Sequence, residues 1–280
     1  MKQQEFTSTL KKFEEYLLKE ERERGTIDKY LRDLKGFLSW LNGVKISKMS
    51  AIAWKQSLVS AQYAPATINS MLASVNKYFA YLGRQECRIK YLRVQRKLFR
   101  DTTKELTKEE YMRLLEAAHN LGRERLSLLI ESICATGIRV SEVKYITVEA
   151  AGKGYAEVFL KGKIRTILLP GKLCRKLLKY AKRQKITSGE LFLTRSGKGI
   201  SRRQIWSEMK TLCKAANVIP SKVFPHNLRH LFAKIFYGIC RDIVKLADVL
   251  GHSSIETTRI YLVSTGIEYS QQLEGLGLIH

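Results

Sequence analysis

The sequence predicts a mainly helical protein with two domains and one small β-hairpin. Apolar residues recur at helical spacing through the first 85 residues and again after residue 105. The stretch YAEVFLKGKIRTILLP, residues 155–170, instead alternates like two short strands joined by a turn. With 280 residues, each half of the chain is long enough to bury a core of its own.

The first domain is expected to be a helical bundle at residues 1–87. Gly25 and Asn42 are expected to separate its helices, and Pro65 to begin the last long helix. The apolar runs with helical spacing lie at 6–17, 27–41 and 68–82. A set of aromatic residues is expected in the bundle core rather than in a base-stacking surface: Phe37, Trp40, Tyr78, Phe79 and Tyr81.

Residues 88–104 are expected to form a basic linker between the domains. This segment, RIKYLRVQRKLFRDTTK, has seven basic residues, one acidic residue and no amphipathic period. Two interpretations stay open: a solvated connector, or a strap that lies along phosphates and gains affinity from counterion release.

The second domain is expected at residues 105–280. Thr107 and Glu110 form a capping box that predicts a helix start, and Gly137 is a typical residue after a helix end. Beyond the hairpin the pattern returns to helix. The helices expected there are 173–182, 203–216, one after Pro225, 243–250 and one that carries Tyr261.

The charge of the chain indicates a polyanionic partner. The formal net charge is +24, which exceeds what solubility requires and favours nucleic acid as the partner. A generic basic protein is the alternative that charge by itself leaves open. The chain shows no signal-peptide core and no apolar run long enough for a membrane span, so a soluble cytoplasmic protein is expected.

The cysteines argue against a disulfide framework and a zinc ribbon. They stand apart, without a CxxC pair, and reduced thiols are expected. They are Cys87, Cys134, Cys174, Cys213 and Cys240.

Two arginines are candidates for binding a phosphodiester. Arg139 follows the glycine that ends a predicted helix, and Arg229 lies three residues after His226 in the helix that begins near Pro225. Guanidinium groups are permanently charged and contact two phosphate oxygens at once, so they can neutralise charge at a pentavalent phosphorus. His226 is the adjacent candidate for phosphate contact or proton transfer.

A metal site is the competing interpretation of the same helix. His226 and His230 are four residues apart, as in HExxH, but Asn227 stands where that motif has glutamate. No further ligand cluster is evident. We therefore expect no metal and no cofactor, and a structural role for His230.

The remaining candidates are a histidine, a tyrosine and a lysine. His252 is expected in a tight turn between helices, before a capping box of Ser253 and Glu256 that begins the helix bearing Tyr261. A phenol needs neighbouring cations or a base to become a nucleophile, and this chain supplies cations. Lys161, in the hairpin turn, could protonate a departing 5′-oxygen.

The second domain resembles the tyrosine recombinase (phage integrase) family from about Thr107 to Tyr261. The resemblance rests on ATGIRVSE, the LKGKIR hairpin, PHNLRH and LGHSSIETTRIY, in that order. The segments TIDKYLRDLKGFLSWL and TINSMLASVNKYFAYL are similar to the family's core-binding, SAM-like domain. The resemblance therefore implies a core-binding bundle followed by a catalytic domain.

The resemblance also implies roles for individual residues. Arg139, His226, Arg229 and His252 would form the phosphate-binding and proton-transfer set, with Tyr261 as the nucleophile. Glu142 matches an acidic position that supports the site. The hairpin is shorter than the family's common KGxKxR, which leaves Lys161 and Lys163 both open as the general acid; Lys161 is favoured because it precedes the turn glycine.

The activity implied by the resemblance is DNA strand exchange through a 3′-phosphotyrosine, without ATP or metal. The expected partners are double-stranded DNA and further copies of the chain, as a homo-tetramer on two duplexes with a dimer on each, with or without accessory proteins. The tail Tyr269–Leu278 is the expected exchange segment. The short N-terminus favours a Xer-like or mobile-element type. The alternatives are a non-catalytic DNA-binding protein and a type IB topoisomerase-like enzyme.

Overall fold

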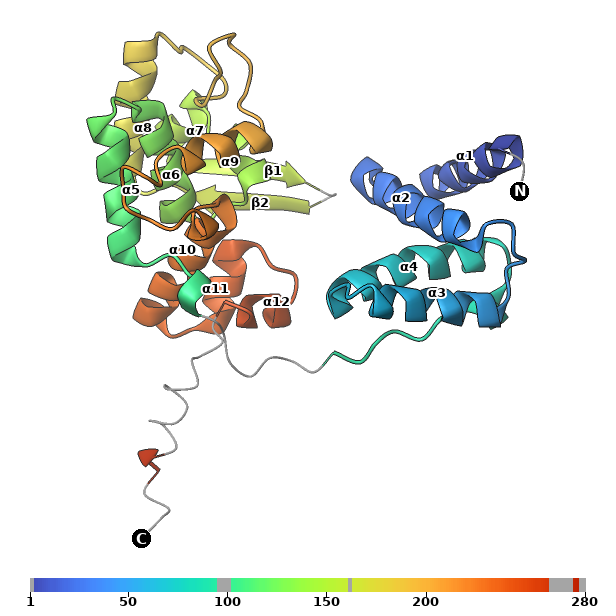
Figure 1. Ribbon diagram of the computed structural model, residues 1–280. Helices are drawn as coiled ribbons and strands as arrows, with labels where there is room; N and C mark the ends of the chain where they lie inside the picture. The colour runs from blue at the N-terminus through green and yellow to red at the C-terminus, as the bar shows by residue number, and fades with distance from the viewer. Residues whose placement is uncertain (1–2, 95–101, 161–162, 262–273, 277–280) are drawn as a thin grey trace. The chain divides into compact units, whose positions relative to one another are not determined.

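The computed structural model describes residues 3–94, 102–160, 163–261 and 274–276 (Figure 1). The chain divides into two compact units, Met1–Arg96 and Lys97–His280. Both are built mainly from helices, and the described sheet is one antiparallel pair of strands in the second unit. The predicted fold class is therefore confirmed.

The first unit is a bundle of four α-helices. They are α1 (Gln3–Lys19), α2 (Arg24–Leu41), α3 (Lys48–Ser60) and α4 (Pro65–Tyr81). Pro65 is the first residue of α4 as predicted, but Gly25 lies inside α2 instead of before it. The sequence analysis did not identify α3, which begins with a capping box at Ser47 and buries Trp54.

Most of the predicted aromatic core is present. Phe37 and Phe79 are fully buried, and their rings meet edge to face at 5.8 Å. Tyr78 is also buried, but the prediction is wrong for Trp40, which is 42% exposed. Trp40 lies near the end of α2 on the side away from the core, where helical spacing alone did not distinguish it from its neighbours.

Two asparagines of α4 hold the start of the predicted linker against the first unit. The Asn76 amide donates to the Ile89 carbonyl and accepts from its N–H, at 2.9 and 2.8 Å. Asn69 makes the same pair of bonds with Leu92. Since these asparagines are two helical turns apart, they fix the chain in an extended path along α4.

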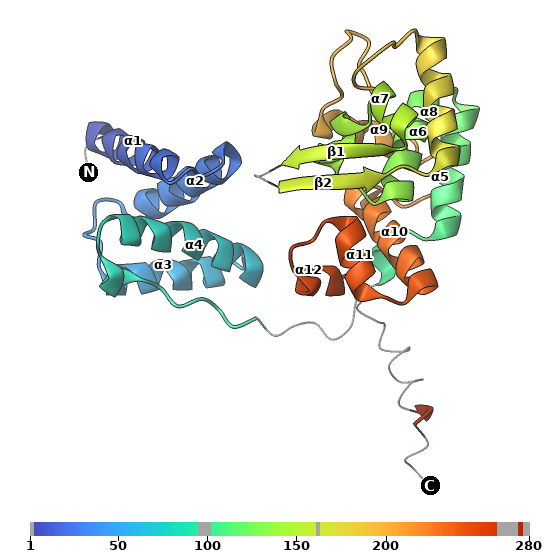
Figure 2. The same cartoon turned by 180° about the vertical axis from the view of Figure 1, so that it is seen from behind.

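The second unit has one large core surrounded by helices. Its elements are α5 (Lys108–Asn120), α6 (Glu124–Thr136), α7 (Val148–Lys153), β1 (Tyr155–Leu160), β2 (Lys163–Leu168), α8 (Gly171–Gln184), α9 (Arg202–Lys210), α10 (Pro225–Cys240), α11 (Ile243–Leu250) and α12 (Ile255–Arg259). Helix α6 packs against α5, α8 and α10, and α11 packs against α10 and α12 (Figures 1 and 2).

Helix ends in this unit follow the sequence signals in most places. The Thr107–Glu110 capping box begins α5, and Gly137 ends α6 in the left-handed conformation. Two predictions are corrected. Helix α9 is shorter than expected, and the cap of α12 is Ser254, whose hydroxyl accepts from the Glu256 N–H, instead of Ser253. Helix α12 ends at Arg259, so the prediction that the helix carries Tyr261 is also wrong.

The β-hairpin has one buried face and one exposed face. Val158 on β1 pairs with Arg165 on β2, and Ala156 pairs with Ile167. Ala156, Val158 and Ile167 are buried, so Arg165 also projects from the face that packs on the unit. The opposite face exposes Phe159 and other apolar residues.

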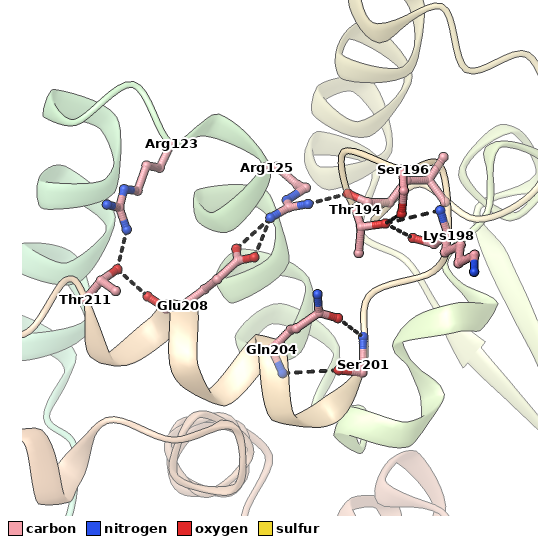
Figure 3. Close-up of polar contacts among 10 residues, drawn as sticks. Arg123, Arg125, Thr194, Ser196, Lys198, Ser201, Gln204, Glu208 and Thr211 are labelled. Atoms are coloured by element: carbon pink, nitrogen blue, oxygen red, sulfur yellow. Dashed lines mark hydrogen bonds and ion pairs between the residues drawn. The ribbon is translucent and has the colours of Figure 1, made fainter.

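Polar contacts position α9 against α6 (Figure 3). The Arg125 guanidinium lies 2.5 and 2.7 Å from the two carboxylate oxygens of Glu208, and it also donates to the Leu193 carbonyl. Ser201 and Gln204 form the capping box that begins α9. The Arg125–Glu208 pair has one positive and one negative group, so its charges balance.

Candidate active site

Arg139 is placed by the end of α6 and by its own cap. Gly137 has φ +63°, and a Cβ there would overlap the Phe232 ring, so the turn requires glycine. The Arg139 N–H donates to Glu142 at 2.8 Å, and the Arg139 guanidinium lies 2.9 Å from the same carboxylate. The side chain stays 41% exposed, so the guanidinium can still meet a ligand.

Arg229 lies at the centre of the site and is almost entirely buried. Only 2% of the residue is exposed, and it projects from the N-terminal part of α10. Its guanidinium donates to the Gly137 carbonyl and, at 2.7 Å, to the Leu250 carbonyl. Burial lowers its pKa, while contact with the Tyr261 hydroxyl opposes that change.

Arg165 joins this cluster, although the sequence analysis did not select it. Its guanidinium donates to the carbonyls of Leu250 and Val249, the latter at 3.1 Å, and lies 3.4 Å from the Glu142 carboxylate. The side chain is 10% exposed. Burial lowers the pKa of Arg165 to about 10, with the Glu142 charge acting in the opposite direction.

Three guanidinium groups thus meet at the C-terminal end of α11. Arg139 completes the set by donating to the Gly251 carbonyl at 3.2 Å. The last carbonyls of a helix carry partial negative charge and attract cations. Glu142, which is 1% exposed, is the one carboxylate that contacts these arginines among the described residues. Three positive groups against one negative group leave a site suited to an anion.

His252 is held as a neutral imidazole by its two partners. Its Nε2 lies 2.9 Å from an Arg229 nitrogen, and its Nδ1 lies 2.8 Å from the Thr258 hydroxyl. Because arginine only donates, Nε2 accepts and the ring proton is on Nδ1. Burial, together with repulsion from Arg229, Arg139 and Arg165, lowers the pKa of His252 to about 4.

Tyr261 lies among three histidine rings. The ring centroid of His230 is 4.2 Å away, that of His252 is 5.5 Å away, and that of His226 is 5.8 Å away. Tyr261 is 7% exposed and packs with residues of α10 and α11. The structure therefore brings together five of the six predicted site residues: Arg139, His226, Arg229, His252 and Tyr261.

The remaining predicted groups lie outside the described residues in whole or in part. Lys161 is outside them, and of Lys163 only the backbone in β2 is described. The predicted exchange tail Tyr269–Leu278 is outside them except for residues 274–276. The two ends of the described hairpin, Leu160 and Lys163, pair with each other.

The part of the chain that the structure describes contains no set of side chains suited to bind a metal ion. No group of three or more histidine, cysteine or acidic side chains is arranged to hold a metal there. The described helices also include none that is long and apolar enough to cross a membrane. Chemically, the cluster can hold an oxyanion beside a phenol and three imidazoles.

Two members of the site escaped the sequence analysis. Strand alternation could have identified Arg165, since residues two apart in a strand lie on the same face and Ile167 is buried. Thr258, which is fully buried against His252, carries no comparable signal because its role depends on a contact between side chains and not on a local pattern. Conversely, His230 lies nearer to Tyr261 than the other two histidines do.

Comparisons with known proteins agree with this arrangement. Residues 104–266 match the model of the phage integrase family, and residues 10–86 match the phage integrase N-terminal SAM-like domain. Tyrosine recombinase XerA of Pyrococcus furiosus is 30% identical over 98% of this chain and 95% of its own length.

Solved structures show the same fold. The XerH site-specific recombinase bound to difH in a pre-cleavage complex has a TM-score of 0.67 and 22% identity, over 84% of this chain and 74% of that chain. A lambda integrase tetramer bound to a Holliday junction has a TM-score of 0.70 and 18% identity, over 91% of this chain and 76% of that chain.

Proposed function

Because the chain belongs to the phage integrase family, and so is a tyrosine recombinase that cleaves and rejoins DNA at specific sites, we propose that Tyr261 is its nucleophile. The phenolic oxygen of Tyr261 bonds to the scissile phosphorus, and the bond from phosphorus to the 5′-oxygen breaks. This leaves a 3′-phosphotyrosine and a free 5′-hydroxyl. A hydroxyl of the partner strand then reverses the reaction, so the number of phosphodiesters does not change.

The observation that carries this proposal is the position of Tyr261 beside the arginine cluster. The Tyr261 ring is within 6 Å of the rings of His226 and His252, and its hydroxyl interacts with Arg229. Arg139 and Arg229 would hold the non-bridging oxygens and neutralise the charge of the pentavalent phosphorus. Since Tyr261 is buried, the site must open when DNA binds.

Proton transfer is assigned to His226, His252 and a lysine: one of the two imidazoles accepts the phenolic proton of Tyr261 as its oxygen bonds to phosphorus, and the lysine supplies the proton of the 5′-hydroxyl. His252 is neutral at pH 7 because its pKa is about 4, and a bound phosphate would raise that pKa by adding negative charge. His226 is exposed at the start of α10, where DNA can reach it. Lys161, which follows β1 in the sequence, is assigned as the general acid that protonates the 5′-oxygen, in preference to Lys163.

The proposed assembly is a homo-tetramer on two double-stranded DNA sites, with a dimer on each. The net charge of +24 supports a large contact with duplex DNA. Structural neighbours include XerH bound to difH and a lambda integrase tetramer bound to a Holliday junction. The segment Tyr269–Leu278 is proposed to pass between neighbouring copies. The proposal covers this assembly with or without accessory proteins.

The test is to trap the covalent adduct. The protein is mixed with nicked duplex fragments from its genomic neighbourhood, in which the cleaved end is lost, and the adduct is separated on a denaturing gel. Wild-type protein should form an adduct at Tyr261, whereas Tyr261→Phe should bind DNA and form none. Tyr155→Phe, at an exposed position of β1, is the matched control and should react normally.

Three results would change the assignment. An adduct that persists in Tyr261→Phe would place the nucleophile elsewhere. Supercoil relaxation without recombinant products would favour the topoisomerase-like alternative. DNA binding without any adduct would favour a non-catalytic DNA-binding protein.

A further inference from the structure

We infer that Arg165 is a positioning residue that holds Arg139 and the Gly251–His252 turn in the geometry that binds the scissile phosphate. This inference rests on the proposed function of the same site. Arg165 projects from the inner face of the hairpin, and its contacts reach both sides of the arginine cluster.

The first side is the carboxylate that orients Arg139. Glu142 Oε1 lies 2.9 Å from Arg139 and 3.4 Å from Arg165, so one oxygen serves both guanidinium groups. The Arg139 N–H fixes the other oxygen, Oε2, at 2.8 Å. The shared Oε1 therefore lies between the Arg139 guanidinium, which is 41% exposed, and the Arg165 guanidinium, which holds it from the buried side.

The second side is the turn that carries His252. Arg165 donates to the carbonyls of Val249 and Leu250, and its side chain covers Gly251, which has φ +62°. A Cβ at Gly251 would overlap the Arg165 side chain. Glycine at this position therefore serves two purposes: the left-handed turn and the close approach of the arginine.

Arg165 itself does not bind the phosphate in this arrangement. Its side chain is 10% exposed, and both terminal nitrogens already donate to backbone carbonyls. Its Nε is buried without a partner among the described residues. A buried guanidinium with an unpaired N–H is less favourable than an apolar side chain of similar size, so stability alone does not explain an arginine here.

The experiment compares two DNA substrates that differ by one charge. A methylphosphonate, in which a methyl group replaces one non-bridging oxygen at the mapped cleavage site, needs less neutralisation than a phosphate. Arg165→Met and Arg165→Lys are compared with wild type and with Arg175→Met, which removes a charge from an exposed position of α8. Duplex affinity and the single-turnover rate of adduct formation are measured on each substrate.

On phosphate, Arg165→Met should lower the cleavage rate about 100-fold, whereas duplex affinity should change about threefold or less. The reason is that misplaced catalytic groups lower the rate of reaction more than they lower the affinity for DNA. On methylphosphonate, the deficit relative to wild type should fall to about fivefold, because Arg139 has less charge to neutralise. The cleavage rate of Arg165→Lys should lie between those of wild type and Arg165→Met. Arg175→Met should cleave both substrates at the wild-type rate.

Equal deficits of Arg165→Met on the two substrates would overturn the inference, as would a wild-type rate on phosphate. Each protein is measured on both substrates from one preparation, so a partly unfolded fraction cancels from the comparison. If Arg165→Met does not fold, Arg165→Lys provides the same comparison. Failure of the wild-type protein to form an adduct at Tyr261 would instead overturn the proposed function.

Discussion

Arg125 and the cluster of Arg139, Arg165 and Arg229 belong to the same unit, but their charges are compensated differently. Arg125 meets the two oxygens of Glu208 and has one carbonyl partner (Figure 3). Arg139 and Arg165 share the single carboxylate of Glu142, and Arg229 has no carboxylate partner in the described part of the chain. All three arginines also contact carbonyls at helix ends, whose charges are only partial.

This difference separates a structural ion pair from a binding site. The Arg125–Glu208 pair links α6 to α9, and it needs no anion from solution to neutralise its charge. An unbalanced cluster costs folding free energy, because buried like charges repel one another. In the proposed reaction this cost is recovered when the phosphodiester of DNA binds to the cluster. Buried arginines in excess of carboxylates therefore mark the site more specifically than the total charge does.

The largest expected effect is a difference in the rate of adduct formation between a variant of the arginine cluster and a variant of the Arg125–Glu208 pair. Arg139→Met should lower the rate of adduct formation about 100- to 1000-fold, since one charged donor to the developing oxyanion is lost. Arg125→Met removes an equal charge and should leave that rate within about threefold of wild type, because an ion pair remote from the chemistry acts on stability. Single-turnover cleavage measures both. Equal losses in the two variants would remove the distinction.

The next effect is on stability at the turn that supports the arginine cluster. Gly137→Ala should lower the free energy of unfolding by about 2–4 kcal/mol, because the new methyl group overlaps Phe232 and alanine disfavours a φ of +63°. Urea titration measures the change. Gly197→Ala is the control, since its φ is also positive but no atom lies within 4 Å of the new group. If the two variants lose equal stability, overlap with Phe232 is not the cause.

A smaller effect concerns the pH dependence of stability. The pKa of His252 is lowered from 6.5 to about 4, so the folded state favours the neutral ring. The preference for neutral His252 contributes about 1–2 kcal/mol to the free energy of unfolding, after allowance for solvent screening. This contribution is complete above pH 6.5 and is lost as the pH falls to about 4. His252→Gln should remove this part of the pH dependence in urea titrations between pH 7 and 4. An unchanged pH profile in that variant would contradict the assigned neutral tautomer.

The smallest expected effect is at the balanced pair. Glu208→Gln should lower the free energy of unfolding by about 0.5–1 kcal/mol, since Arg125 is only part-buried and keeps its Leu193 carbonyl. Glu142→Gln should cost about 3 kcal/mol or more because it leaves Arg165 buried without a charged partner. Thermal unfolding at matched pH compares the two. A larger loss for Glu208→Gln would reverse the contrast between the clusters.

Much of the fold could be predicted because local signals mark helix ends. The Thr107 capping box, Gly137 and Pro65 each act within one turn of the helix that they begin or end. Helix α3 was missed because its apolar residues do not gather on one face: Trp54 is buried, whereas Met49 and Val59 are exposed. Tyr261 was placed inside a helix that ends two residues earlier. Both errors concern elements whose extent depends on packing more than on local sequence.

By itself, the sequence determined the residue types of the site and their order, since Arg139, His226, Arg229, His252 and Tyr261 lie in recognisable motifs. Only the tertiary structure decided that Arg165 joins them, that Glu142 is shared by two arginines, and that His252 is neutral. The physical reason is that charge compensation and burial depend on distances between segments far apart in the chain. Arg165 and Leu250 are 85 residues apart, and no local pattern records their contact.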